Sequence, residues 1–118
     1  MNARKTKALR RIVGAVATDK ELVKQINSLF FNSNHFRNAN VAVNKGPEAL
    51  YDNLKGVYPE LKSNKTVSEG MQATLRNFAD TGVFINPANK QMLIDQARTY
   101  VAMVGNYITI KNYENRDN

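Results

Sequence analysis

The sequence predicts a mainly α-helical protein, a compact bundle of about five helices, and three observations lead to this prediction. Apolar residues recur three and four positions apart through most of the chain, which is the spacing of one face of a helix. Motifs that begin helices, Thr-x-x-Glu and x-Pro, separate these stretches. The length of 118 residues suits one domain, which we assign to residues 1–118. One short β hairpin or a C-terminal edge strand is the extended structure that we expect beside the helices.

A basic helix is predicted at the N-terminus, over about residues 3–17. Its apolar side chains fall at i, i+3, i+4 and i+7 and therefore share one face: Leu9, Ile12, Val13 and Val16. The cations Arg4, Lys7 and Arg11 share another face, with Arg10 beside them. The first 18 residues contain no acid, so the charges of the first turn oppose the helix dipole. We therefore expect an anionic or protein neighbour to help hold this helix.

The second helix is predicted to begin at the capping box Thr18–Glu21 and to end near Phe31. One face of this helix carries the apolar residues Leu22, Ile26, Leu29 and Phe30. An Asn-rich loop is predicted after it, over about residues 32–46, because short amide side chains compete for backbone hydrogen bonds. Within that loop, the Val-Ala-Val sequence at 41–43 could pair as a short strand.

The third helix is predicted to open at Gly46-Pro47, with the proline at the first helical position. Its apolar residues keep helical spacing: Leu50, Leu54, Val57 and Leu61. Pro59 has no amide hydrogen to donate, so the helix is expected to break or kink near Tyr58.

The fourth helix is predicted to begin at a second capping box, Thr66–Glu69, and to stop at Gly82. Its apolar face is formed by Met71, Leu75, Phe78 and Ala79. Residues 83–85 (Val-Phe-Ile) are then expected to form a short apolar connector.

The last long helix is predicted to start at Asn86-Pro87 and to end or loosen at Gly105-Asn106. Its apolar face carries Leu93, Ala97, Tyr100, Val101 and Val104. Residues 107–111 (Tyr-Ile-Thr-Ile-Lys) alternate and are rich in β-branched side chains, which indicates a terminal strand. Residues 114–118 are expected to be frayed.

The composition argues against catalysis and against cofactors. The absence of cysteine excludes disulfides, thiol nucleophiles, Fe–S clusters and cysteine-based zinc sites. His35 is the only imidazole, and no acid lies within ten residues of it, so we interpret it as an exposed or partly packed loop histidine. The acids show no metal-binding spacing and the glycines form no phosphate loop. We expect no enzyme, cofactor, metal or small-molecule substrate; a small enzyme would depend on His35 or on carboxylates that converge only in space.

Charge is concentrated in the first half of the chain. Lysine and arginine total 17 against 10 acids, for a net charge of +7, and residues 1–62 hold 11 of the bases and 5 of the acids. The first candidate binding site is the basic cluster Arg4, Lys5, Lys7, Arg10 and Arg11. Such a helix could neutralise several phosphates of DNA or RNA without reading sequence, or dock on an acidic protein surface.

The second candidate site lies on the third helix, where tyrosine and lysine interleave. Tyr51, Lys55, Tyr58 and Lys62 fall at i, i+4, i+7 and i+11 and therefore share a face. These side chains could stack on bases or grip a partner protein. Alternatively, the rings close the edge of the core while the lysine stems extend outward.

Two segments resemble small basic accessory or virion proteins of tailed bacteriophages. The opening residues 1–11 (MNARKTKALRR) contain the run R-K-x-K-x-L-R-R, and residues 54–62 (LKGVYPELK) contain K-G-x-Y-x-x-L-K. The two segments cover about a sixth of the chain, and Pro59 departs from the more basic pattern of the second element. The resemblance implies a phage protein and no catalytic residues.

From these observations the expected function is that of a non-enzymatic virion structural or assembly protein. Its basic N-terminal helix would contact nucleic acid or an acidic subunit, and its partners would be other virion subunits or copies of itself. The alternative is a soluble nucleic-acid-binding or regulatory phage protein acting in the infected cell. No apolar run approaches the roughly 18 residues of a membrane helix, and no signal peptide is recognised. We therefore expect no membrane partner, and a location in the virion or the host cytoplasm.

Overall fold

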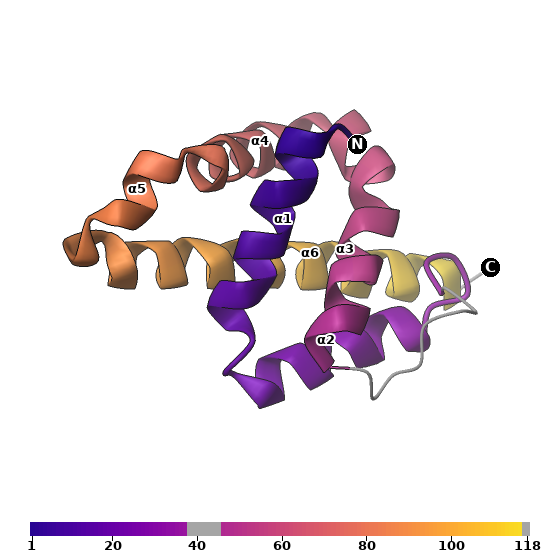
Figure 1. Cartoon of the computed structure of the whole chain (residues 1–118). Helices are drawn as coiled ribbons and strands as arrows, with labels where there is room; N and C mark the ends of the chain where they lie inside the picture. Colours follow the sequence, from indigo (N-terminus) through magenta and orange to yellow (C-terminus); the bar gives the residue numbers. More distant parts are fainter. Residues whose placement is uncertain (38–45, 117–118) are drawn as a thin grey trace.

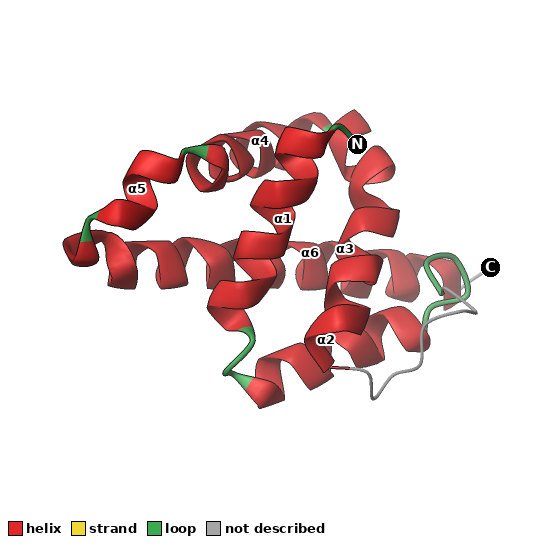
Figure 2. Cartoon of the chain, in the orientation of Figure 1, coloured by secondary structure: helices red, strands yellow, loops and turns green. Residues whose placement is uncertain are grey.

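The computed structural model describes residues 1–37 and 46–116, and these residues form six α-helices and one short 3₁₀ helix (Figure 1). Every regular element that is described is helical, so the mainly α fold is confirmed (Figure 2). The strand predicted at 41–43 lies outside the described residues. None of the helices in the described ranges is long and apolar enough to cross a membrane. The elements are α1 (Ala3–Val16), α2 (Lys20–Phe31), α3 (Gly46–Ser63), α4 (Lys65–Ala79), α5 (Thr81–Ile85), η1 (Pro87–Asn89) and α6 (Lys90–Arg116).

The basic helix α1 lies at the centre of the bundle. It crosses α6 and is flanked by α3 and α4, while α2 packs on α3 and α6 (Figure 1). The apolar face predicted for α1 is fully buried in this arrangement, and so are the apolar faces of α3 and of the first part of α6. Removing these faces from water is the main favourable term that holds short helices together.

Two helices begin at a residue other than the predicted Thr-x-x-Glu box. Asp19, not Thr18, caps α2, because its carboxylate accepts from the amide of Leu22 at 3.2 Å. The N-cap of α4 is Asn64, whose side-chain oxygen accepts from the amides of Thr66 and Val67. Asp and Asn are at least as good N-cap residues as Thr. An Asp or Asn next to a Thr-x-x-Glu sequence can therefore cap the helix in place of the Thr.

The break predicted near Pro59 is wrong, and α4 ends at Ala79, three residues before the stop predicted at Gly82. Helix α3 continues through Pro59 to Ser63. The proline leaves the carbonyl of Lys55 without a helical donor, but both residues are exposed, so water can satisfy that carbonyl. Gly82 lies inside the short helix α5, which Asp80 caps by accepting from the Gly82 amide at 2.9 Å. The connector at 83–85 is therefore helical.

The C-terminal strand is also a wrong prediction, because α6 runs unbroken through Gly105 to Arg116. A Cβ atom on Gly105 would lie 2.6 Å from Cδ1 of Ile26, so this glycine serves close packing of α6 on α2 and does not end the helix. The β-branched residues at 107–111 follow a helical pattern as well, since Ile108 extends the fully buried series Val101 and Val104. Residues 114–116, which were predicted to be frayed, belong to α6, and residues 117–118 lie outside the described residues.

Candidate anion-binding face

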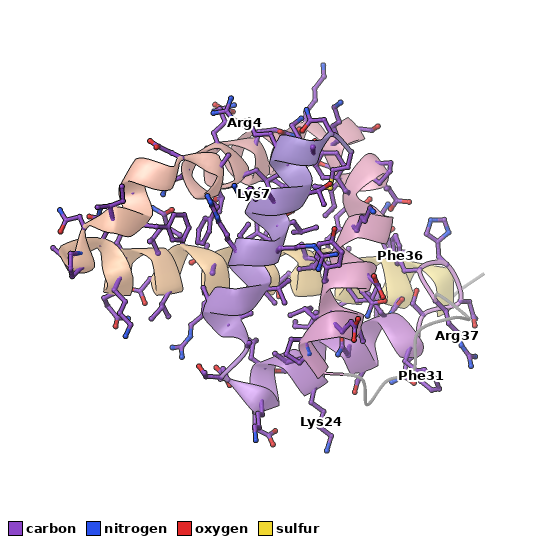
Figure 3. All side chains as sticks on the ribbon, in the orientation of Figure 1. Arg4, Lys7, Lys24, Phe31, Phe36 and Arg37 are labelled. Atoms are coloured by element: carbon purple, nitrogen blue, oxygen red, sulfur yellow. The ribbon has the colours of Figure 1, made fainter. Side chains whose placement is uncertain are left out.

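Helix α1 has three cations exposed to solvent. Its exposed residues are Arg4, Lys7 and Arg10, together with the small residues Ala3 and Gly14. Figure 3 shows Arg4 and Lys7 on the side of α1 that lies toward α4. We call the surface formed by Arg4, Lys7 and Arg10 the cationic face. No large apolar side chain of α1 is exposed on it, because the apolar residues of this helix are in the core.

The two clusters that the sequence marked separately meet at the contact between α1 and α3. Nζ of Lys5 donates to the hydroxyl of Tyr58 at 2.8 Å, and the guanidinium of Arg10 lies 4.0 Å from the ring centroid of Tyr51. Both tyrosines are buried, with 4% and 6% of their surface exposed. This burial agrees with the interpretation that the rings cover the edge of the core. Buried rings are not accessible for bases to stack on. Tyr58 and Tyr51 therefore act here as supports that fix the positions of two cations.

The lysines of the second cluster are accessible to solvent in the described part of the chain. Lys55 and Lys62 are exposed on α3. The electrostatics of Tyr58 record the positive charge gathered here: burial acts to raise its pKa, but hydrogen bonds from Lys5 and Gln72 and the charges of Lys5 and Lys62 lower it overall. Lysines from both helices thus lie near Tyr58 at the contact between α1 and α3.

Arg11 differs from the other cations because the fold uses it directly. Its Nη1 atom donates to the carbonyl of Phe78 at 2.9 Å, and its guanidinium lies 4.8 Å from the ring centroid of Phe84. The two phenylalanine rings contact each other edge to face at 5.6 Å. Arg11 therefore ties α1 to α4 and α5, and its replacement would disturb packing as well as charge.

Sequence reasoning missed one cation, Arg76 of α4. It lines a small groove of about 160 Å³ between α1 and α4, together with Arg4 and Lys5. The residues next to Arg76 in the sequence are uncharged, so no local charge pattern indicates a binding role for it. Only the packing of α4 on α1 brings it to the cluster.

None of the five α1 cations forms an ion pair within residues 1–37 and 46–116. Arg10 and Arg11 rest on aromatic rings, Arg11 and Lys5 also donate to neutral oxygens, and a carboxylate partner is absent among the described side chains. The positive charge of this helix is therefore not cancelled by the fold. The ion pairs among the described residues are Arg98–Asp19 and Lys111–Glu114, and the imidazole of His35 contacts Glu60.

The lone histidine has an acidic neighbour that the sequence did not indicate. Nε2 of His35 lies 2.8 Å from one oxygen of Glu60, and the hydroxyl of Tyr107 donates to the other at 2.7 Å. Burial opposes ionisation of Glu60, but these hydrogen bonds lower its pKa overall, while burial and the carboxylate raise the pKa of Tyr107 to about 12. His35 is 55% exposed, and the described residues hold no group of three metal-ligating side chains. The contact fastens the turn after α2 to α3 and α6.

Comparison of the chain with protein-family models, with curated proteins and with solved structures gives no match in any of the three.

Proposed function

We propose that this protein is a non-enzymatic structural or assembly component of a bacteriophage particle that contacts nucleic acid through the cationic face of α1. The observation that carries the proposal is the row of exposed cations, Arg4, Lys7 and Arg10, without a carboxylate partner in the described part of the chain. The assignment to a phage rests on the two sequence segments that resemble small basic phage proteins.

The chemistry of the cationic face favours nucleic acid over an acidic protein subunit. A protein interface normally has an apolar core surrounded by a polar rim. The exposed side of α1 offers only cations, Ala3 and Gly14, and so provides no such core. A phosphate backbone, in contrast, is a continuous line of anions. It matches a helix that lies within the first 18 residues, which contain no acid.

Binding at this face would read charge and shape, not base sequence. Base recognition needs groups that reach base edges or open rings on which bases stack. The two rings nearest to the cations, Tyr51 and Tyr58, are buried. The expected behaviour is affinity for DNA and RNA that varies little with sequence and falls steeply as salt rises.

The test is the salt dependence of binding to duplex DNA. The variant Arg4→Gln/Lys7→Gln removes two exposed charges, and Lys20→Gln/Lys24→Gln removes the same net charge from α2 as a control. Each phosphate contact contributes about 0.9 to the slope of log K against log salt, so the first variant should lower the slope by about 2. The control should leave the slope unchanged. Equal slopes for both variants, or an affinity that does not change with salt, would overturn the proposal. Binding to an acidic protein subunit without binding to DNA would overturn it as well and would identify that subunit as the partner.

The place of the protein in the particle is tested separately. Mass spectrometry of purified particles of the phage that encodes it should find several copies per particle. DNA binding without any copy in the particle would instead support the alternative, a nucleic-acid-binding or regulatory protein of the infected cell.

A further inference from the structure

The exposed side of α6 has the opposite character to the cationic face of α1. Residues 99–113 include a single charged residue, although charged residues make up 23% of the chain. The exposed positions recur at helical spacing and form what we call the neutral face: Thr99, Ala102, Asn106, Thr109, Ile110 and Tyr113. Two of them are large and apolar or aromatic, with Ile110 57% and Tyr113 69% exposed. Exposed apolar side chains gathered on one helix typically mark an interaction surface.

A groove runs beside this face, between α6 and the start of α4. It measures about 590 Å³, and Val67 and Met103 give it an apolar lining next to Ile110. The two charged residues that line it, Lys111 and Glu114, lie 3.4 Å apart and neutralise each other. The groove and the neutral face together form a surface without net charge.

We propose that a second copy of this chain covers this surface, with the two α6 helices packed antiparallel about a two-fold axis at Asn106. The net charge of +7 makes two copies repel each other at most approaches. The neutral face allows close approach without that cost. Because α1 crosses in front of α6 in Figure 1, contact through α6 also keeps the two cationic faces far apart.

The order of side chains on the neutral face is self-complementary in size. An antiparallel pair centred on Asn106 sets Tyr113 of one copy against Thr99 of the other, and Ile110 against Ala102. Each large side chain thus meets a small one, and the two Asn106 amides can donate to each other. A standard interface buries about 800 Å² per partner. That area is about a ninth of the 7318 Å² that the whole molecule exposes.

The dimer would present a cationic face on each of two opposite sides. If the proposed nucleic-acid contact holds, one dimer could bridge two segments of DNA, and avidity would then exceed the affinity of either face. The dimer itself does not depend on the proposed function.

The first test is sedimentation of the full chain over a range of concentrations. The wild-type protein should reach the mass of two chains, and Ala102→Arg should weaken self-association about 100-fold or more by placing an unpaired charge in the contact. Ala73→Arg adds the same charge at an exposed position of α4 outside the groove and should still dimerise. A wild-type protein that stays monomeric, or a dimer that Ala102→Arg leaves intact, would overturn the inference.

The second test fixes the arrangement by disulfide crosslinking, which the absence of native cysteine makes unambiguous. Asn106→Cys should crosslink rapidly, because the two copies of residue 106 meet on the axis. Thr99→Cys alone should crosslink poorly, whereas Thr99→Cys/Tyr113→Cys should crosslink well. Rapid crosslinking of exposed Gln25→Cys with none at 106 would contradict the α6 contact. A wild-type dimer that does not bind DNA would contradict only the proposed function, whereas a wild-type monomer that binds DNA would contradict only the dimer.

Discussion

The hydroxyl of Tyr51 is buried and has no hydrogen-bond partner among residues 1–37 and 46–116, so its removal should stabilise the protein. Tyr51 is 6% exposed, and its ring supports Arg10 from α3. The substitution Tyr51→Phe keeps that ring and takes away only the unpaired hydroxyl.

The expected gain follows from the desolvation of that hydroxyl. A buried hydroxyl without a partner costs about 1–3 kcal/mol relative to its hydrated state in the unfolded chain. Losing some packing around the oxygen offsets part of the gain, so Tyr51→Phe should raise the free energy of unfolding by about 1 kcal/mol. At about 2.1 cal/mol/K per residue, 118 residues give an unfolding entropy near 0.25 kcal/mol/K, so Tm should rise by about 4 °C.

Tyr58→Phe is the matched control, because it removes the same atom where that atom is used. The hydroxyl of Tyr58 accepts from Lys5 at 2.8 Å and from Gln72 at 3.0 Å. Loss of two such bonds, partly offset by hydration of the freed donors, should cost about 1–2 kcal/mol. Urea unfolding monitored by circular dichroism measures both variants with the wild type. The reasoning is refuted if Tyr51→Phe lowers the midpoint as Tyr58→Phe does.

Three further predictions concern packing and titration. Gly105→Val should destabilise the fold by about 1–3 kcal/mol, because its Cβ would meet Cδ1 of Ile26 at 2.6 Å; an unchanged urea midpoint would show that α2 moves aside freely. The pKa of Glu60 is lowered in the folded protein, so the ionised carboxylate stabilises the fold at pH values above its ordinary pKa of about 4.3. This contribution is lost as the pH falls through the pKa of the folded state. Glu60→Gln should therefore flatten the acid side of a plot of stability against pH. The pKa of Tyr107, raised to about 12, gives stability that is present below about pH 10 and lost as the pH rises toward 12. In an alkaline titration followed by tyrosine absorbance, Tyr107→Phe should remove one tyrosine that ionises at high pH. If the absorbance change at high pH stays the same, the tyrosine that ionises there is not Tyr107.

The positions of the helices were predictable because they depend on local pattern. The buried faces of α1, α3 and α6 follow the three- and four-residue spacing of apolar residues. The predictions at Gly105 and Pro59 are wrong because local rules do not include the surroundings of a helix-breaking residue. Gly105 serves the packing of α6 on α2, and Pro59 is tolerated because it lies on the exposed side of α3.

The candidate site was predictable only in part. The row of cations on α1 is a local pattern, and so is the alternation of tyrosine and lysine on α3. Their meeting at the contact of α1 with α3 depends on how the helices pack, as do the approach of Arg76 and the pairing of His35 with Glu60. The last pair lies 25 residues apart, beyond the reach of any spacing rule.

The manner in which α1 is held explains how a helix without acids can be stable and still keep its charge. The charges of its first turn oppose the helix dipole, and groups within the chain support the helix. Asn2 caps the helix by accepting from the amide of Lys5 at 2.9 Å, and the side chains of Lys5, Arg10 and Arg11 are fixed by phenolic, aromatic and carbonyl groups. Carboxylates would fix these cations equally well, but each would cancel one positive charge. Neutral supports fix their positions and leave the field intact, which is what binding to a polyanion requires.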